Sequence, residues 1–392
     1  MRYIKYIWLV VLLVCICSEI GDAQVPRKVL GVGVEEGVVT PPTGACLGSF
    51  TMSNIGVLDF TEQSANGVLG LGVFENSFNG FGYLGVLSTA ATSYNIYRIN
   101  LITFLSDLTI VVDVANSPDS ASSHDSSYYD TGSSRYVNVG RQITGACLAT
   151  QDCLHIREYN VGTLTIDTIV AGITFGTPTG VLTFDATDYY IVYGSPGATL
   201  GKVSTSNIFV ASTAIAAIPA ALTTDNTYLY GTVGTTTIRR WLKSSIGTAP
   251  TDFTPGFLGG SALTGIIYDS GNNSLYVASP SAGLGPNYIH KVDASTMTLT
   301  GSVALGNTDF VKNISIDSVN DKLYVGYALV GTTGGVARLN RTAFTSSATF
   351  GTVSTANGPV RFVLDVPHQD FYIAFAGGGG DVVKVQKINL CQ

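Results

Sequence analysis

Three stretches of the chain share one pattern and decide the fold: GIIYDSGNNSLYVAS (265–279), ISIDSVNDKLYVGYA (314–328) and FVLDVPHQDFYIAFA (362–376). Each contains a β-rich run, an Asp, a short turn, and a second run that carries Tyr seven residues after the Asp. When the turn length is relaxed, four further copies are found, the first of them degenerate, around Asp59, Asp130, Asp185 and Asp225. The mean spacing of the copies, about 51 residues, is typical of four-stranded propeller blades.

A second pattern follows each copy of the first. It is a short alternating strand whose third residue is basic in six of seven copies, Glu158 being the exception. The copies are IYRINL (96–101), IREYNV (156–161), LGKVST (200–205), IRRWLK (238–243), IHKVDA (289–294), VARLNR (336–341) and VQKINL (385–390). Most are followed by another alternating run, so each unit has four strands, named a to d from the centre outwards. The sequence therefore predicts an all-β fold, a seven-bladed β-propeller of four-stranded antiparallel blades.

The two ends of the chain predict how the ring closes. The last unit stops after its third strand, which would leave a sheet edge exposed. The segment ACLGSFTMS (45–53) matches the missing outer strand, so we expect a ring closed by the N-terminal strand. Cys391 would then face Cys46, and a disulfide between them would constrain a very long loop. The remaining cysteines, Cys147 and Cys153, would form a second disulfide within a loop of the second blade.

The repeats resemble those of seven-bladed extracellular β-propellers in the broad YVTN and NHL-like group. They are also similar to the propeller repeats of large secreted protist proteins. The resemblance covers roughly residues 45–391. It implies the fold but not the biochemical function, because propellers include enzymes, adhesins and scaffolds.

The N-terminal residues predict a secreted protein. Basic Arg2 and Lys5 precede an apolar run at 7–17, and small residues end the segment at Ala23, as in a signal peptide. The expected organisation is a signal peptide at 1–23, an N-terminal extension at 24–44 and the propeller at 45–392. Four cysteines would remain, an even number, as expected for disulfides in an oxidising compartment.

The charge of the chain argues against a polyanionic partner. The formal net charge is −7 and charged residues make up only 12% of the chain. Nucleic-acid binding needs a clustered basic surface, so no nucleic-acid partner is expected. The apolar run is too short to cross a bilayer, and we expect no membrane insertion after signal cleavage.

The repeated residues have structural interpretations. Asp between two strands caps the turn by accepting backbone N–H groups. The basic residue of strand c is expected to pair with a carboxylate within or between blades. The repeated Tyr is expected to pack between blades with its hydroxyl at a rim, the alternative being a carbohydrate-stacking surface.

The sequence contains no recognisable constellation of catalytic residues. The four histidines are spread over different units without metal-site spacing: His124, His155, His290 and His368. No nucleophile elbow or phosphate-binding loop is present in the required context. We predict no catalytic residues, no metal site and no cofactor, and we interpret His290 as a residue of the blade.

The long loops of the first two blades provide the candidate binding surface, because function on this scaffold is usually carried by loops. The predicted loops are 75–93, 115–125 and the segment holding Cys147 and Cys153. They would form one raised rim, whose candidate binding residues are Phe78, Phe81, Tyr83, His124 and Asp125. The alternative is that these aromatic residues fold back over the blade edge.

Three sequons are permissive for N-glycosylation in a secreted chain, at Asn272, Asn313 and Asn340. Asn272 is the favoured site because it is expected in a turn, whereas Asn313 begins an inner strand and Asn340 ends a strand.

Three functions compete. The first is a non-enzymatic binding or structural module that uses one propeller face to hold an extracellular protein or glycan at the cell surface or matrix. The second is a secreted hydrolase or lyase with an axial active site. The third is a self-assembling extracellular coat or filament protein, which the low charge and the abundance of Gly and Thr would suit.

Overall fold

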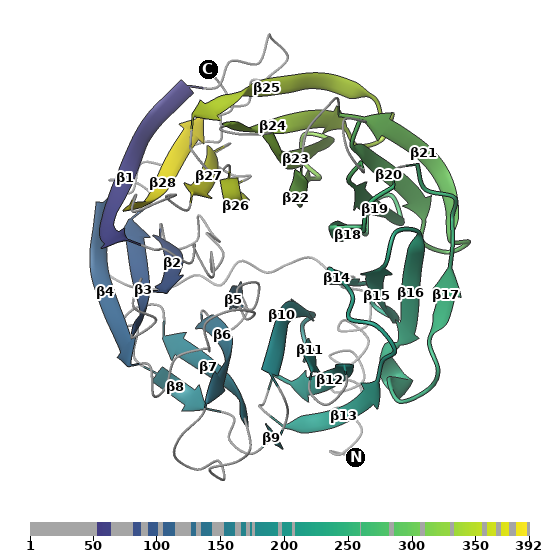
Figure 1. Cartoon of the computed structure of the whole chain (residues 1–392), viewed down its shortest axis with the longest axis horizontal. Coiled ribbons are helices and arrows are strands. Elements are labelled where there is room, and N and C mark those ends of the chain that lie inside the picture. Colours follow the sequence, from purple (N-terminus) through teal and green to yellow (C-terminus); the bar gives the residue numbers. More distant parts are fainter. Residues whose placement is uncertain are drawn as a thin grey trace, which may run out of the picture. The chain divides into compact units, whose positions relative to one another are not determined.

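Antiparallel β-sheets make up the described part of the chain (Figure 1). All described residues belong to one compact unit, Gly44–Gln392. The computed structural model describes parts of this unit: residues 53–63, 81–87, 93–100, 105–113, 127–130, 135–142, 153–160, 166–169, 173–174, 177–194, 198–205, 208–258, 260–281, 286–305, 310–329, 333–354, 359–365, 370–375 and 382–389. Side chains are described for Ile99 and for most of 181–345.

Four of the sheets follow the predicted order of four consecutive antiparallel strands. One contains β10 (Thr177–Phe184), β11 (Asp188–Gly194), β12 (Ala198–Ser204) and β13 (Phe209–Ala214). The next contains β14 (Leu222–Thr224), β15 (Tyr228–Val233), β16 (Thr237–Leu242) and β17 (Thr251–Phe253), with a 3₁₀ turn at Lys243–Ser245. The third contains β18 (Gly265–Asp269), β19 (Ser274–Ser279), β20 (Tyr288–Asp293) and β21 (Thr298–Ala304). The fourth contains β22 (Phe310–Asp317), β23 (Lys322–Leu329), β24 (Thr333–Asn340) and β25 (Ser346–Ser354).

The remaining strands form three further sheets in the described residues. The C-terminal sheet contains β26 (Pro359–Asp365), β27 (Asp370–Phe375), β28 (Val382–Asn389) and, beside β28, β1 (Ser53–Gln63). A three-stranded sheet contains β2 (Phe81–Leu87), β3 (Ser93–Asn100) and β4 (Leu105–Asp113). The last contains β5 (Ser127–Asp130), β6 (Arg135–Gln142), β7 (Cys153–Asn160) and β8 (Ile166–Ile169), with β9 (Ile173–Thr174) beside β7.

Burial along the strands reflects their place in a sheet. All six residues of β19, a strand b, are buried, because side chains on both faces meet a neighbouring sheet. In β21, an outermost strand, exposed and half-buried residues alternate, as expected for a strand with one face toward solvent. The strands a of successive sheets, β10, β14, β18, β22 and β26, lie beside one another (Figure 1).

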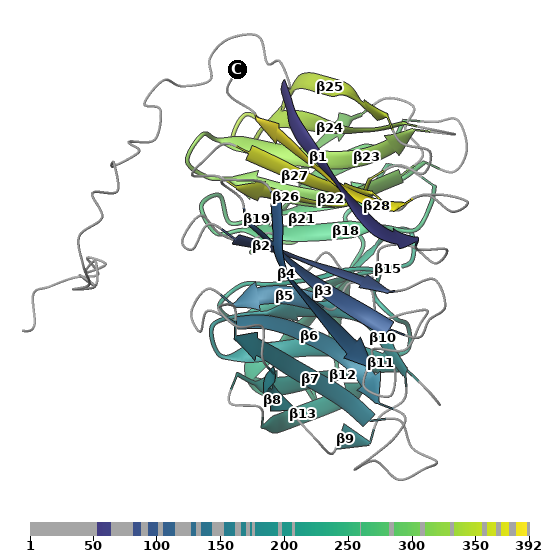
Figure 2. The ribbon, with the colours of Figure 1, turned by 90° about the vertical axis from the view of Figure 1, so that its left-hand side faces the viewer.

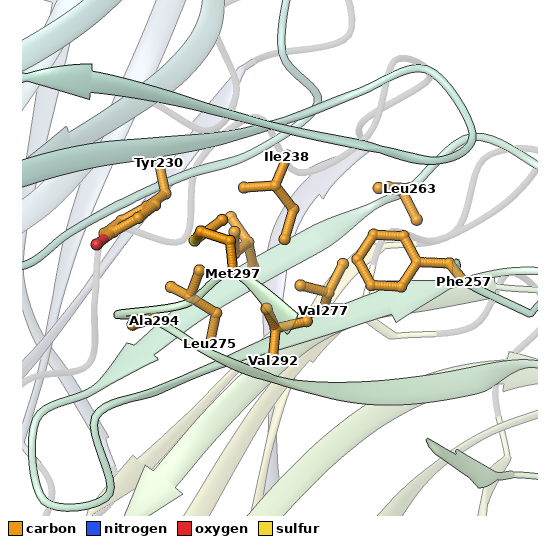
Figure 3. Close-up of a cluster of buried hydrophobic side chains, with 10 residues drawn as sticks. Tyr230, Ile238, Phe257, Leu263, Leu275, Val277, Val292, Ala294 and Met297 are labelled. Carbon is orange, nitrogen blue, oxygen red and sulfur yellow. The ribbon is translucent and has the colours of Figure 1, made fainter. Parts of the chain in front are cut away.

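The hydrophobic core consists of separate clusters, each between two successive sheets. Figure 3 shows the cluster between the β14–β17 and β18–β21 sheets, where Tyr230 and Ile238 meet Leu275, Val277 and Val292. A similar cluster lies on each side of this one. Full burial of one such aliphatic side chain contributes about 1.5–3 kcal/mol, so the contacts between sheets are the main source of stability.

The strand beside β28 begins later in the sequence than predicted. It is β1, which pairs antiparallel with β28 so that Val57 lies opposite Gln386 (Figure 2). Of the predicted segment 45–53, only Ser53 lies within the described residues. The error came from Asp59, which we interpreted as a turn residue but which lies inside β1. The alternation of Leu58, Asp59 and Phe60 is that of an outer strand with one face toward solvent.

The position of Asp59 also shifts the first repeat. The segment 81–87, predicted to lie in a loop, is strand β2 and pairs with β3 along its whole length. Its register places Tyr83 opposite Arg98, as Tyr276 lies opposite Lys291 in a later sheet. Tyr83 is therefore the repeated Tyr of this sheet, which the sequence analysis missed.

Candidate functional site

Each four-stranded sheet has two ends, which differ in the connections they carry. Because strand direction alternates, the a–b and c–d turns lie at one end, here named the turn face. The b–c and d–a connections lie at the other end, the loop face.

On the turn face, the repeated Asp caps the a–b turn in all four sheets where its side chain is described. Asp185 Oδ1 accepts the N–H groups of Thr187 and Asp188, at 2.9 Å each. The same role is played by Asp225, Asp269 and Asp317. The structural interpretation of these carboxylates is thereby confirmed at these positions.

The repeated Tyr packs between neighbouring sheets, as predicted, but its hydroxyl ends in a hydrogen bond instead of at a solvent rim. Where the turn is short, Tyr190 donates to Asp185 of its own turn at 3.2 Å. Where the turn is two residues longer, Tyr276 donates instead to the backbone oxygen of Arg341 in the next sheet, at 2.8 Å. The four side chains are at most 2% exposed: Tyr190, Tyr230, Tyr276 and Tyr324.

The basic residue of strand c pairs with a carboxylate less often than predicted. Lys202 lies 3.0 Å from Asp188. By contrast, the guanidinium of Arg240 lies over the ring of Tyr228 at 4.3 Å, and Lys291 lies over Tyr276 at 5.8 Å. The prediction is wrong for the latter two residues, because their charged groups lie over aromatic rings and form no ion pair with a carboxylate among the described residues.

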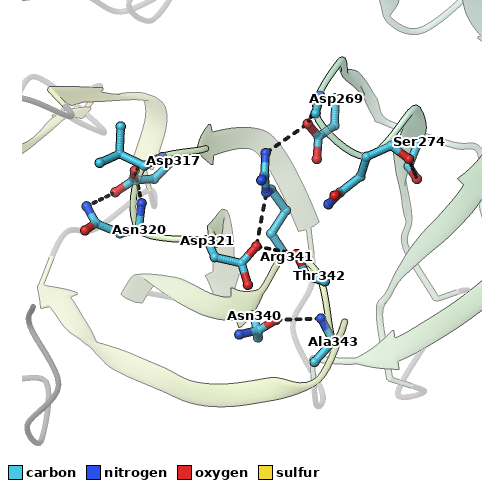
Figure 4. A network of polar contacts seen from close by, with 12 residues as sticks. Asp269, Ser274, Asp317, Asn320, Asp321, Asn340, Arg341, Thr342 and Ala343 are labelled. Atoms are coloured by element: carbon cyan, nitrogen blue, oxygen red, sulfur yellow. Dashed lines mark hydrogen bonds and ion pairs between the residues drawn. The ribbon is translucent and has the colours of Figure 1, made fainter.

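A second basic residue, three positions after the first, links neighbouring sheets across the turn face. Arg341 Nη1 lies 3.0 Å from Asp269 in the preceding sheet, and its Nε lies 3.3 Å from Asp321 in its own sheet (Figure 4). Lys243 repeats this arrangement, with its Nζ 2.6 Å from Asp185 in the preceding sheet. The only sequence feature that could have predicted these ion pairs between sheets is the basic sixth residue of IRRWLK and VARLNR.

The ion pair of Lys243 keeps Asp185 charged in acid. Burial alone would raise the pKa of Asp185, but hydrogen bonds from Lys243 and Thr187 outweigh it and lower the pKa to about 2. The stabilisation is present above pH 3.8, the ordinary value, and is lost as the pH falls from there through 2.

Ion-linked contacts between sheets alternate with an apolar one. Ala294 occupies the sixth position of IHKVDA, where the next unit has Arg341, and it is buried in the cluster of Figure 3. Among the described residues, no ion pair joins the β14–β17 sheet to the β18–β21 sheet.

On the loop face, the d–a connection 254–264 presents an exposed apolar side chain from an anchored backbone. Phe257 is buried in the core cluster, whereas its neighbour Leu258 is 50% exposed. The backbone oxygen of Leu258 accepts two hydrogen bonds, from Ser279 Oγ at 2.8 Å and from His290 Nε2 at 3.0 Å. The two hydrogen bonds therefore hold the loop backbone against β19 and β20, while the side chain of Leu258 is exposed to solvent.

His290 is a buried anchor, in agreement with its interpretation as a blade residue. A carbonyl oxygen can only accept, so Nε2 carries the proton, and Nδ1 accepts from the Ser302 hydroxyl at 2.8 Å. The ring stacks on Phe257, with centroids 4.8 Å apart. Burial lowers the pKa of His290 and outweighs the opposite effect of its bond to Leu258, so the neutral form is favoured.

Acidification from pH 7 to pH 5 is expected to destabilise the protein through His290. The unfolded chain, whose imidazole titrates near 6.5, takes up the proton first, so this stabilisation is present above pH 6.5 and is lost as the pH falls below it. The loss approaches about 1.4 kcal/mol per pH unit. Urea unfolding at pH 5, 6 and 7 measures it, and His290→Gln should show a smaller loss. Equal losses in both proteins would contradict the assignment.

The preceding d–a connection, 215–221, carries a second exposed apolar side chain on the loop face. Ile218 is 49% exposed. Its loop bonds to β15 through Ala220 N–H and Thr232 O, and the Leu258 loop bonds to the β15–β16 turn through Leu263 N–H and Gly234 O. Neither connection contains a charged residue. Both connections are thus bonded to the β15–β16 hairpin at the loop face, and we name their exposed side chains, Ile218 and Leu258, the apolar pair.

The apolar pair was not among the candidate residues predicted from the sequence. Of those candidates, Phe78, His124 and Asp125 lie outside the described residues. Phe81 and Tyr83 lie in the first half of β2, toward the turn face, and not in a loop of the rim. Whether they bind a partner stays a prediction.

The disulfide and sequon predictions are only partly within the described residues. Cys46, Cys147 and Cys391 lie outside them, and only the backbone of Cys153 is described, at the start of β7. Asn313 lies in β22, an inner strand. The organisation into 1–23, 24–44 and 45–392 likewise stays a prediction.

The described part of the chain contains neither a metal-binding cluster nor a membrane-spanning helix. No group of three or more His, Cys, Asp or Glu side chains could hold a metal ion there. No helix there has the length and apolar character to span a membrane.

Comparisons with known proteins bear on the fold. No protein-family model and no curated protein matches the sequence. Among solved structures, a chain in the crystal structure of a mitotic checkpoint complex is similar, with a TM-score of 0.59 and 11% sequence identity. The alignment covers 93% of this chain and 100% of that chain. The WD40 domain of Toxoplasma gondii coronin gives a TM-score of 0.57 at 8% identity, covering 87% and 88%. These likenesses show that the fold is a β-propeller.

Proposed function

We propose that the protein is a secreted, non-enzymatic binding module: a propeller of seven blades, closed by β1 in the last blade. Seven sheets in the described residues and the pairing of β1 with β28 support this architecture. The sequence pattern at 1–23, which is that of a signal peptide, supports secretion. The finer resemblance to extracellular YVTN and NHL-like propellers belongs to the same proposal.

The docking surface that we propose is the loop face beside β15 and β16, and the single observation that carries it is the apolar pair. Ile218 and Leu258 are half exposed on connections that are bonded to the scaffold, so little ordering entropy opposes binding. A glycan surface requires hydroxyl partners or aromatic platforms, whereas two aliphatic side chains on uncharged loops suit an apolar segment of a protein. We therefore propose an extracellular protein as the partner.

Replacing the apolar pair is expected to weaken binding about tenfold or more, the effect of losing central apolar contacts in an interface. The assay measures binding of purified residues 24–392 to cultured cell surfaces and to an array of matrix proteins and glycans. The variant is Ile218→Ser with Leu258→Ser.

The matched control is Val319→Ser, because Val319 is also aliphatic and is 79% exposed but lies on the turn face. An equal loss in the control and the double variant would place docking elsewhere. If the protein bound glycans and no matrix protein, the proposal of a protein partner would be wrong. Secretion is checked separately, by N-terminal sequencing of protein from the culture medium, where Gln24 is the expected first residue.

One observation favours a second candidate function, self-assembly into a coat or filament. Strand β13 is the outermost strand of its sheet, and Ile208, Phe209 and Val210 are consecutive and 65%, 40% and 51% exposed. An uncharged apolar edge strand can pair with the same strand of another copy. A chain that stays monomeric in sedimentation at high concentration would exclude this function.

A further inference from the structure

We infer that Asn340, and not Asn272, carries an N-linked glycan, and that the sugar therefore projects from the turn face, opposite the proposed docking surface. The inference rests on the proposed secretion, because only the secretory pathway attaches such glycans. Both residues stand in N-x-S/T sequons, so the sequence alone treats them alike. Their surroundings in the folded protein differ.

The amide of Asn340 is held with its nitrogen free. Its Oδ1 accepts the backbone N–H of Ala343 at 2.6 Å, and an N–H group can only donate, which fixes the oxygen on that side. Nδ2, the atom that a glycan modifies, has no hydrogen-bond partner among the described residues and lies on the side away from Ala343 (Figure 4). Thr342, which completes the sequon, is exposed. A sugar on Asn340 therefore breaks no bond of the fold.

The amide of Asn272 is turned the other way. The hydroxyl of Tyr276 donates to the backbone oxygen of Arg341, so it accepts from Asn272 Nδ2, at 3.5 Å. Tyr276 is fully buried, and Ser274, which completes this sequon, is 4% exposed. A sugar on Asn272 would begin against a closed contact between two sheets and would require the amide to turn outward. The structure thus reverses the preference drawn from the sequence.

The position of Asn340 also bears on the proposed docking surface. Asn340 ends β24, a strand c, so it lies at the turn face, whereas the apolar pair lies on the loop face. A glycan there would cover part of the turn face and leave the loop face open to a partner. Asn272, in the a–b turn between β18 and β19, also lies at the turn face, so neither of these two sequons places a glycan on the loop face.

The test uses the chain expressed in cultured animal cells behind a heterologous signal sequence, which separates the glycan site from native secretion. Intact mass of the secreted protein before and after enzymatic removal of N-glycans is the measurement. The loss of one glycan mass is expected in Asn340→Gln and in Thr342→Ala, which removes the sequon but keeps Asn340. The mass is expected to be unchanged in Asn272→Gln and in Thr342→Ser, which keeps the sequon.

Loss of the glycan in Asn272→Gln alone, or a wild-type chain without any N-glycan in this system, would overturn the inference. Asn313→Gln is included because a loss there would assign the sugar to the inner strand β22 instead. Failure of the native N-terminus to direct secretion would refute the proposed function and leave this result standing. Deglycosylated protein is expected to keep its binding in the assay above, and a loss of binding would place the docking surface at the turn face.

Discussion

The substitution Arg341→Met lowers the free energy of unfolding by about 3–5 kcal/mol, the expected cost of leaving a buried charge without its partner. Asp269 is 3% exposed, and Arg341 is the basic residue that compensates its charge. Asp321 would lose the same partner, at less cost because it is more exposed. Urea unfolding at pH 7 gives the free energy from the midpoint and slope.

The matched control for this substitution is Arg239→Met. Arg239 also bonds to a carboxylate at 2.7 Å, but Asp252 is 46% exposed, so its loss is expected to cost less than about 1 kcal/mol. The double variant Asp269→Asn with Arg341→Met removes the buried charge and should recover part of the stability. Equal costs for Arg341→Met and Arg239→Met would show that the contact across the sheets does not carry the difference.

The substitution Tyr276→Ala is expected to cost about 3–5 kcal/mol, because it leaves a ring-sized cavity between two sheets. The side chain of Tyr276 is fully buried in the cluster between the β18–β21 and β22–β25 sheets. Burial raises the pKa of its hydroxyl to about 12. Tyr276→Phe keeps the ring and removes one hydrogen bond, so its expected cost is only about 1 kcal/mol.

Thermal and urea unfolding of the two Tyr276 variants separate packing from hydrogen bonding. If Tyr276→Phe and Tyr276→Ala lowered the free energy of unfolding equally, the hydrogen bond from the hydroxyl to Arg341 would be the main contribution and the packing of the ring a minor one. If neither substitution changed the free energy of unfolding, Tyr276 would have no role in joining the two sheets.

Local sequence patterns predicted the sheets well, because the interactions that define each strand and turn are made by residues close together in the sequence. The Asp of each turn caps N–H groups two or three residues away, and the alternation of each strand is set by its own two faces. The β-propeller fold and its four-stranded antiparallel sheets are confirmed, whereas the narrower family resemblance stays a prediction. The N-terminal segment was misplaced because Asp59 sits in an outer strand, where an acidic residue needs no turn.

The candidate site could not be predicted in the same way, because exposure depends on contacts that are distant in sequence. Phe257 and Leu258 are adjacent and equally apolar, yet one is buried and the other half exposed. The difference is set by His290 and Ser279, which hold the backbone of Leu258 from another strand pair. The link from Arg341 to Asp269 likewise joins residues of different repeats, and no pattern within one repeat discloses it.

The alternation of ion-linked and apolar contacts divides this part of the molecule into cooperative units. Lys243 ties the β14–β17 sheet to the sheet before it, and Arg341 ties the β22–β25 sheet to β18–β21. Between these two pairs lies the interface at Ala294, which has no ion pair among the described residues and is held by apolar packing and by hydrogen bonds such as that from Tyr268 N–H to Thr223 Oγ1, at 3.0 Å. Partial opening of the native state would therefore follow the boundary at Ala294, and sheets would exchange their amide protons in pairs.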